Sequence, residues 1–221
     1  MTDPDSPLVF AKATAARGLR PEARQAHQAV LRHFADTGVR PSAATIADPV
    51  ILAELEAADL VLVDPSGEIR AAYPFSPSPT AHQVHIADGP TAYAMCAIDA
   101  LGISTMLGRP TTITSGEPDS DRVIIVNTNG PDATWHPDTA LVYAATTGGR
   151  TTAADTTCRH INFFTTADTA LSWAHLHPEI TGTLWVDRGN SELRALDFKY
   201  SMPPFSVQRK PFARKCPCRY L

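Results

Sequence analysis

Residues 91–107, TAYAMCAIDALGISTML, form a strongly apolar helix candidate, and Gly108 directly after them is a typical stop for a helix. Around this helix the chain alternates between short strand-like runs and one further helical pattern. The expected strands are residues 82–86, 111–114, 123–126, 141–144, 158–164 and 183–186, and the further helix is residues 166–175. This pattern predicts a mixed α/β domain over residues 80–205.

The part of the chain before this domain has the element order of a winged helix. A loose lead-in over residues 1–20 is followed by three helical patterns and a hairpin. The expected helices are residues 21–34, 41–47 and 50–60, and the hairpin strands are residues 60–63 and 69–73 around a turn at 64–67. Three prolines within residues 73–79 favour an extended connector, so we expect a winged-helix-like domain at residues 21–75. The predicted fold class is α+β, with this three-helix unit first.

The winged-helix-like unit is expected to be structural or dimerising rather than DNA-reading. A helix that reads DNA carries Arg, Lys, Asn or Gln near its start, and residues 41–54 contain none of them. The net charge of −4 also gives the chain no basic field that would recruit nucleic acid or anionic lipid.

Composition predicts a soluble cytoplasmic protein. Hydrophobic residues make up 43% and charged residues 19% of the 221 residues, which is ordinary for a globular chain. The acidic start, residues 1–5, lacks the basic and apolar regions of a signal peptide, and no run approaches the ~18 apolar residues of a membrane span. The cysteines are therefore expected to be thiols; they are Cys96, Cys158, Cys216 and Cys218.

Cys96 and Asp99 are the first pair with possible chemistry. On a helix, residues three apart share a face with Cβ atoms about 5–6 Å apart. Their neighbours are nearly all apolar, so we expect burial to raise the pKa of the Asp99 carboxyl and to fit it for acid or base work beside a thiol. Alternatively, Asp99 caps a loop or pairs with Arg109, and Cys96 is a small core residue.

Cys158 is the second candidate thiol. Arg159 and His160 follow it directly, and a nearby cation favours the reactive thiolate over the thiol. The alternative is a buried structural cysteine, and for His160 we favour the role of a core histidine.

Two of these segments together resemble the organomercurial (alkylmercury) lyase family. The run MCAIDAL at residues 95–101, followed by MLGR at 106–109, is similar to the first active-site helix of that family. The run CRHINFF at residues 158–164 is similar to its second cysteine segment, and the helical pattern with Trp173 and the winged-helix-like front end match as well. The resemblance covers roughly residues 20–190.

The resemblance implies cleavage of carbon–mercury bonds. Cys96 and Cys158 match the family's mercury-binding cysteines, and Asp99 matches the residue that protonates the leaving carbon. The products would be a hydrocarbon and Hg(II), which cellular thiols or a mercury-binding or mercury-reducing protein would remove. No organic cofactor is implied.

The sequence departs from the family pattern in two places and carries one addition. Residues 111–121 lack a cysteine that many members have there. Arg159 stands where members often have a second cysteine directly after the first. Arg159 would make the site more basic or indicate a different substrate. The basic tail at residues 206–221 adds Cys216 and Cys218, which form a possible Hg(II) acceptor or are incidental thiols of a loose terminus.

Two other functions stay open. The first is a non-catalytic mercury or soft-metal sensor whose winged helix contacts DNA, although a pure binding site has little use for Asp99. The second is a related enzyme acting on another substrate, such as an organotin.

Overall fold

The computed structural model describes residues 15–42, 46, 48–130, 132–149, 151–187 and 193–195. Most of the expected lead-in, most of the expected helix at 41–47 and the tail with Cys216 and Cys218 lie outside these ranges. Of the expected helix, residues 41, 42 and 46 are described, and they are not helical. Within the described ranges no helix combines the length and the apolar character that crossing a bilayer requires.

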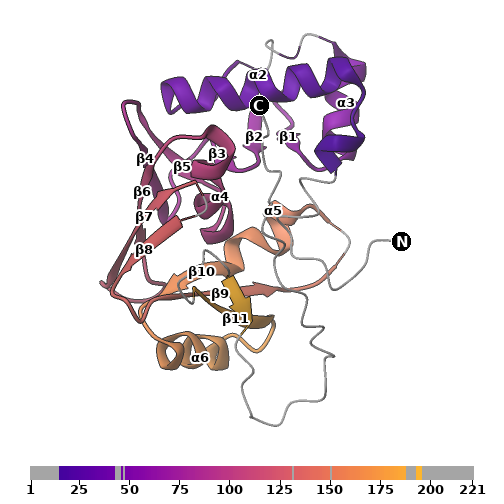
Figure 1. Ribbon diagram of the computed structural model, residues 1–221. Helices are drawn as coiled ribbons and strands as arrows, with labels where there is room; N and C mark the ends of the chain where they lie inside the picture. Colours follow the sequence, from indigo (N-terminus) through magenta and orange to yellow (C-terminus); the bar gives the residue numbers. More distant parts are fainter. Residues whose placement is uncertain are drawn as a thin grey trace.

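In the described residues of the N-terminal part, residues 15–18 are helical and are followed by helices α2 and α3 and a hairpin (Figure 1). Helix α2, Pro21–Thr37, begins with proline and ends at Gly38, whose left-handed backbone lets its N–H bond to the carbonyl of Phe34. Helix α3, Pro49–Ala57, is capped by Asp48. It ends before the expected residue 60 because Asp59 takes a left-handed backbone with φ 52°. Strands β1, Val61–Val63, and β2, Ile69–Ala72, then pair antiparallel, as the hairpin pattern predicts.

An eight-stranded antiparallel sheet runs from this hairpin into the middle of the molecule. Its order is β1-β2-β3-β5-β4-β6-β7-β8. The further strands are β3 Phe75–Ser76, β4 His82–Ile86, β5 Thr91–Ala94, β6 Thr111–Gly116, β7 Val123–Asn129 and β8 Asp132–His136. Strand β3 pairs with both β2 and β5, so the proline-rich residues 73–79 contribute a strand to one continuous sheet. The division of the chain into domains stays a prediction.

The expected single helix over residues 91–107 is wrong in its first part. Residues 91–94 form β5, because they pair with β4 on one side and β3 on the other. Helix α4, Ala97–Leu107, starts only after Cys96 and ends at Gly108, as expected. Cys96 is therefore the residue that caps the helix and does not lie within it.

A second, four-stranded sheet has the order β10-β9-β11-β12. Its strands are β9 Leu141–Thr146, β10 Ile161–Phe164, β11 Thr181–Asp187 and β12 Leu193–Ala195, and helix α6, Ala167–Leu176, covers it. Between β9 and β10 come the short helix α5, Ala153–Thr156, and the 3₁₀ helix η2, Cys158–His160. The expected strand at 158–164 thus begins only at Ile161, and Cys158 lies in the turn before it.

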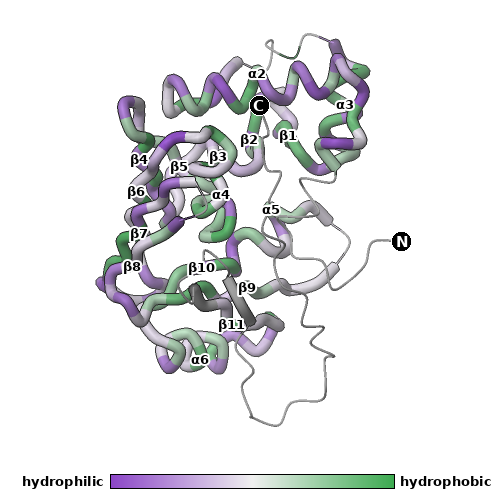
Figure 2. Tube along the Cα trace, in the orientation of Figure 1, coloured by the Kyte–Doolittle hydropathy of each residue, from purple (hydrophilic) through white to green (hydrophobic). Residues whose placement is uncertain are grey.

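Helix α4 lies between the two sheets and contacts strands of both. Figure 2 shows the apolar residues that run along α4 and β10 in the middle of the molecule. One buried apolar cluster joins α2, the large sheet, α4 and part of β10, and it includes Cys96 and Cys158. The two candidate cysteines are therefore in the core, at the place where the N-terminal part, α4 and the second sheet meet.

Candidate active site

Cys96 and Asp99 contact each other at the start of α4. The extended backbone of Cys96 turns its sulfur back over the helix, where it accepts the N–H of Asp99 at 3.4 Å. In return, the Cys96 thiol donates to Oδ2 of Asp99 at 3.0 Å. This is the arrangement of an N-cap residue and the third helical residue, with sulfur in place of the usual hydroxyl oxygen. The expected proximity holds, although it comes from capping and not from a shared helical face.

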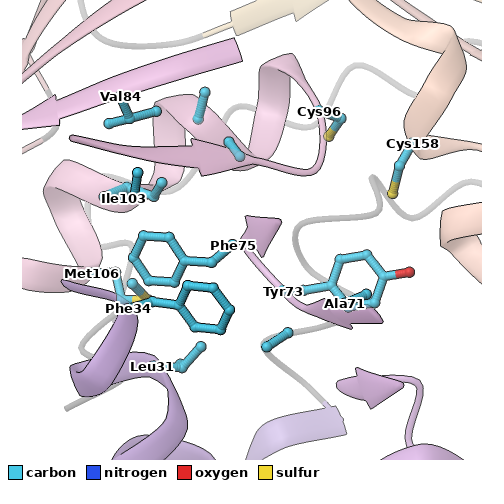
Figure 3. Close-up of a cluster of buried hydrophobic side chains, with 14 of the residues drawn as sticks. Leu31, Phe34, Ala71, Tyr73, Phe75, Val84, Cys96, Ile103, Met106 and Cys158 are labelled. Carbon is cyan, nitrogen blue, oxygen red and sulfur yellow. The ribbon is translucent and has the colours of Figure 1, made fainter. Parts of the chain in front are cut away.

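Cys158 joins this pair from a distant part of the chain. The candidate ligand atoms of Cys96, Asp99 and Cys158 all lie within 4.8 Å of one another. Figure 3 shows the two cysteines side by side in the core, each on a separate element. Both cysteines are free and buried, with 3% and 5% of their surfaces exposed. The structure therefore brings together the three residues that the sequence singled out.

The hairpin of the N-terminal part anchors the segment that carries Cys158. Arg70 on β2 donates two hydrogen bonds to the Asp155 carboxylate, each at 3.2 Å, and one to Thr152 at 3.4 Å. Asp59, which precedes β1, accepts the N–H of Ala153 at 3.1 Å. Helix α5, directly before Cys158, is thus fixed from the side of the hairpin.

A second set of contacts holds the same segment from the side of the large sheet. Asn162 on β10 donates to the carbonyl of Arg159 at 3.1 Å. Asn162 also interacts with His82, whose Nδ1 lies 2.9 Å from the Ser115 hydroxyl. Burial lowers the pKa of His82 to about 4, with Asn162 opposing, so the ring stays neutral and acts as a fixed polar partner.

Burial also decides the resting state of Cys96. It raises the pKa of the Cys96 thiol, and the hydrogen bond with Cys158 and the charge of Asp99 act in the same direction. Cys96 therefore stays protonated, and its thiol donates its hydrogen bond to Asp99. Arg159, next to Cys158, is exposed. His160 is only half-buried, so the expectation of a core histidine is wrong; burial and the charge of Arg159 lower its pKa.

Arg109 is not the partner of Asp99 that one alternative proposed. The two residues lie at opposite ends of α4, which at 1.5 Å per residue separates them by about 15 Å. The guanidinium of Arg109 instead donates to the carbonyl of Ala87.

Within residues 111–121, which lack the cysteine that many family members have, side-chain contacts hold Glu117 in place. Glu117 is buried, accepts the Thr165 hydroxyl at 2.8 Å and lies 3.6 Å from Arg122. These polar contacts tie the turn between β6 and β7 to the end of β10.

Sequence reasoning missed Tyr73 as a neighbour of the site. Its ring is buried in the core cluster with both cysteines. The three prolines of residues 73–79 predict an extended connector at this place. A single tyrosine beside a strand has no spacing pattern that indicates a function. The only available signal was its place at the end of the expected hairpin.

Comparison with known proteins connects this geometry to one family. The alkylmercury lyase (MerB) family model matches residues 75–187. The alkylmercury lyase of Staphylococcus epidermidis is 30% identical over 54% of this chain and 55% of its own length. That of Streptomyces lividans is 30% identical over 47% of this chain and 48% of its own length. The chain thus spans about half the length of the curated relatives that it matches.

A solved structure shares the fold. The mercury-bound form of MerB2 matches with a TM-score of 0.63 over 80% of this chain and 90% of that chain, at 21% identity. The family match covers more than half of the chain and includes Cys96, Asp99 and Cys158. On this evidence, the protein belongs to the alkylmercury lyase family.

Proposed function

We propose that the protein cleaves the carbon–mercury bond of organomercurials by protonolysis, giving a hydrocarbon and Hg(II). The observation that carries the proposal is the cluster of two free thiols and one carboxyl within 4.8 Å, in which the Cys96 proton already points at Asp99. Mercury is a soft ion that binds thiolates in preference to oxygen ligands. The two nearby sulfurs can therefore bind mercury, and the adjacent carboxyl can protonate the carbon that leaves the metal.

In the first step the substrate enters as an organomercury cation carried by a small thiol. Cys158 loses its proton, its sulfur bonds to mercury, and the carrier leaves as a free thiol with that proton. The contacts of Arg70 and Asn162 support this role, since they hold the segment of Cys158 next to Cys96 and Asp99.

In the second step Cys96 gives its proton to Asp99 and its sulfur bonds to mercury. Asp99 then passes this proton to the carbon as the carbon–mercury bond breaks, and the electron pair of that bond forms the new carbon–hydrogen bond. The 3.0 Å contact between the thiol and Oδ2 supports this transfer. The two protons lost by the two cysteines thus end on the carrier thiol and on the hydrocarbon.

The product Hg(II) would stay between Cys96 and Cys158 until a competing thiol removes it. We propose that cellular thiols or a mercury-binding or mercury-reducing protein takes the ion. Because the reaction needs reduced cysteines, we place it in the cytoplasm, where thiols stay reduced.

The tail cysteines are a candidate for the first acceptor of the product. Cys216 and Cys218 stand one residue apart among basic residues, which is compatible with capture of a soft ion. Replacing both with Ser should slow the release of Hg(II) and leave the first turnover unchanged. Equal release from both proteins, measured with a chromogenic chelator, would refute this role.

A pure sensor of mercury fits the site less well than an enzyme does. A binding site would use the two sulfurs alone, whereas here the Cys96 thiol is bonded to a carboxyl that offers no advantage for a soft ion. An organotin or another carbon–metal bond uses the same groups, and the substrate test below includes it.

The experiment is to incubate the protein with phenylmercury, methylmercury or an organotin in excess thiol and to measure benzene or methane. Hydrocarbon from the mercury compounds above the thiol-only background is expected. Asp168→Asn, which changes an exposed Asp in the first turn of α6, is the matched control for substitution of Asp99. Release from the organotin alone would reassign the substrate, and no release from any compound would refute the proposal.

A further inference from the structure

Tyr73 lies at the corner where the N-terminal hairpin meets the reacting centre. Its N–H donates to the carbonyl of Leu60 at 3.1 Å, and the carbonyl of the next residue, Pro74, accepts the N–H of Met95 at 3.0 Å. The backbone of Tyr73 is thus tied on one side to the hairpin and on the other to the residue before Cys96. These ties fix the position of the backbone from which the Tyr73 side chain extends.

The Tyr73 side chain faces Cys158 in the core. Figure 3 shows its ring below the sulfur of Cys158, on the hairpin side of the gap between the two cysteines. Only 3% of the residue is exposed. Besides burial, the charges of Cys158, Asp59 and Asp99 raise the pKa of the Tyr73 hydroxyl, and a hydrogen bond with the backbone of Ala154 lowers it. The phenol therefore faces the thiol that we assign to the first attack on mercury.

The hydroxyl of Tyr73 stays protonated in this position. Burial raises its pKa, and the neighbouring charges of Cys158, Asp59 and Asp99 raise it further. A neutral phenol is a hydrogen-bond donor, and donors to an ionised partner make the stronger hydrogen bonds.

A buried thiolate at Cys158 needs such a donor. Within the part of the chain that the structure describes, the two nearby guanidinium groups are otherwise placed: Arg70 is bonded to Asp155, and Arg159 is exposed. Negative charge that develops on a sulfur in an apolar core is costly unless a polar group faces it.

We propose that Tyr73 is a positioning residue whose hydroxyl donates a hydrogen bond to the Cys158 sulfur and holds that sulfur beside Cys96 and Asp99. The hydroxyl proton stays on its oxygen throughout, and no bond of Tyr73 breaks. The inference rests on the proposed function, but the proposed hydrogen bond can be tested with or without turnover.

The first test measures the reactivity of Cys158 without catalysis. In a background of Cys96→Ser, Cys216→Ser and Cys218→Ser, Cys158 is the single cysteine, and its reaction with 4-(hydroxymercuri)benzoate is followed by absorbance. Tyr73→Phe keeps the ring and removes the hydroxyl. Because the attacking sulfur would lose one hydrogen bond as it takes up charge, a reaction about threefold slower is expected. Tyr143→Phe, a buried tyrosine in the separate cluster around α6, should react like its parent.

The second test uses the otherwise unchanged chain in single turnovers with phenylmercury. Tyr73→Phe should release benzene roughly tenfold more slowly, with the concentration for half-maximal rate and the affinity for Hg(II) each changed by less than about threefold. A merely structural role would instead lower the unfolding midpoint and weaken rate and Hg(II) binding together.

The outcomes separate the two proposals. An unchanged rate of mercury addition to Cys158 in Tyr73→Phe overturns the role of Tyr73, whatever the benzene assay gives. A parallel loss of stability, or an equal effect of Tyr143→Phe, also overturns it. Slower addition to Cys158 in a chain that releases no benzene supports the contact and refutes the lyase proposal alone.

Discussion

The two halves of the candidate site are built in different ways. Cys96 and Asp99 are three residues apart and meet through the cap of one helix. Cys158 reaches them from a 3₁₀ turn that is held by Arg70 on one side and Asn162 on the other. The first half is encoded locally, whereas the second exists only when the hairpin, the large sheet and β10 have packed. Substitutions should therefore act on the first half through chemistry and on the second through position.

The largest effect should come from Asp99→Asn in the local half. Asn keeps the size of the side chain but cannot shuttle a proton, so we expect cleavage to slow by at least about 100-fold while Hg(II) binding persists. Rates are measured as benzene release in single turnovers, and binding by competition with a chromogenic chelator. Cleavage within a few-fold of the parent would show that another group supplies the proton.

A smaller, positional effect should come from Arg70→Met in the assembled half. The pair with Asp155 is more than a third exposed, so we expect a stability change below about 1 kcal/mol. Cleavage should nevertheless slow roughly fivefold, because the segment of Cys158 loses its anchor. Arg20→Met removes an exposed pair with Glu54 away from the site and serves as the control. An equal slowing in both variants would mean that Arg70 has no special link to Cys158.

The local half should also make the protein sensitive to alkali. Folded Cys96 keeps its proton, since its pKa is raised above 9.0, whereas the unfolded thiol loses its proton near that pH. The unfolded state then binds fewer protons, so stability is present below about pH 9 and falls above it, by about 1.4 kcal/mol at pH 10. Urea unfolding of the parent and of Cys96→Ser near pH 7 and pH 10 measures the difference. The same loss in both proteins would assign it to other groups.

The smallest effect concerns the cap itself. Ser at position 96 can accept the N–H of Asp99 as sulfur does, whereas Ala cannot, so Cys96→Ala should be less stable than Cys96→Ser by about 0.5–1 kcal/mol. Both variants should lose cleavage. Equal urea midpoints would show that capping by residue 96 contributes nothing to α4.

Local patterns predicted much of the fold and half of the site. Alternation and turn residues located the hairpin, β4, β6 and β7, and proline and Gly38 bounded α2. The same local reasoning placed Cys96 inside a helix, because an apolar run of TAYA has no period that separates a buried strand from a helix. Residues 91–94 form a strand because they pair with β3 and β4, and these pairings cannot be read from residues 91–107 themselves.

The rest of the site depends on contacts that no spacing encodes. Cys158 lies next to Cys96 because α4 packs on β10. In the sequence, only the resemblance to the family predicts that the two cysteines are close. Tyr73 enters the site because β3 continues the sheet from the hairpin to β5, where the prolines had suggested a connector.

The most direct test of the central claim is a single turnover with the protein in excess over phenylmercury in deuterated water. We expect one benzene per phenylmercury, carrying one deuterium from Asp99, and one Hg(II) retained per reacting chain in a form that Cys96→Ser or Cys158→Ser fails to hold. Benzene at or below the level produced by thiol alone would contradict the claim that Cys96, Asp99 and Cys158 form a carbon–mercury lyase.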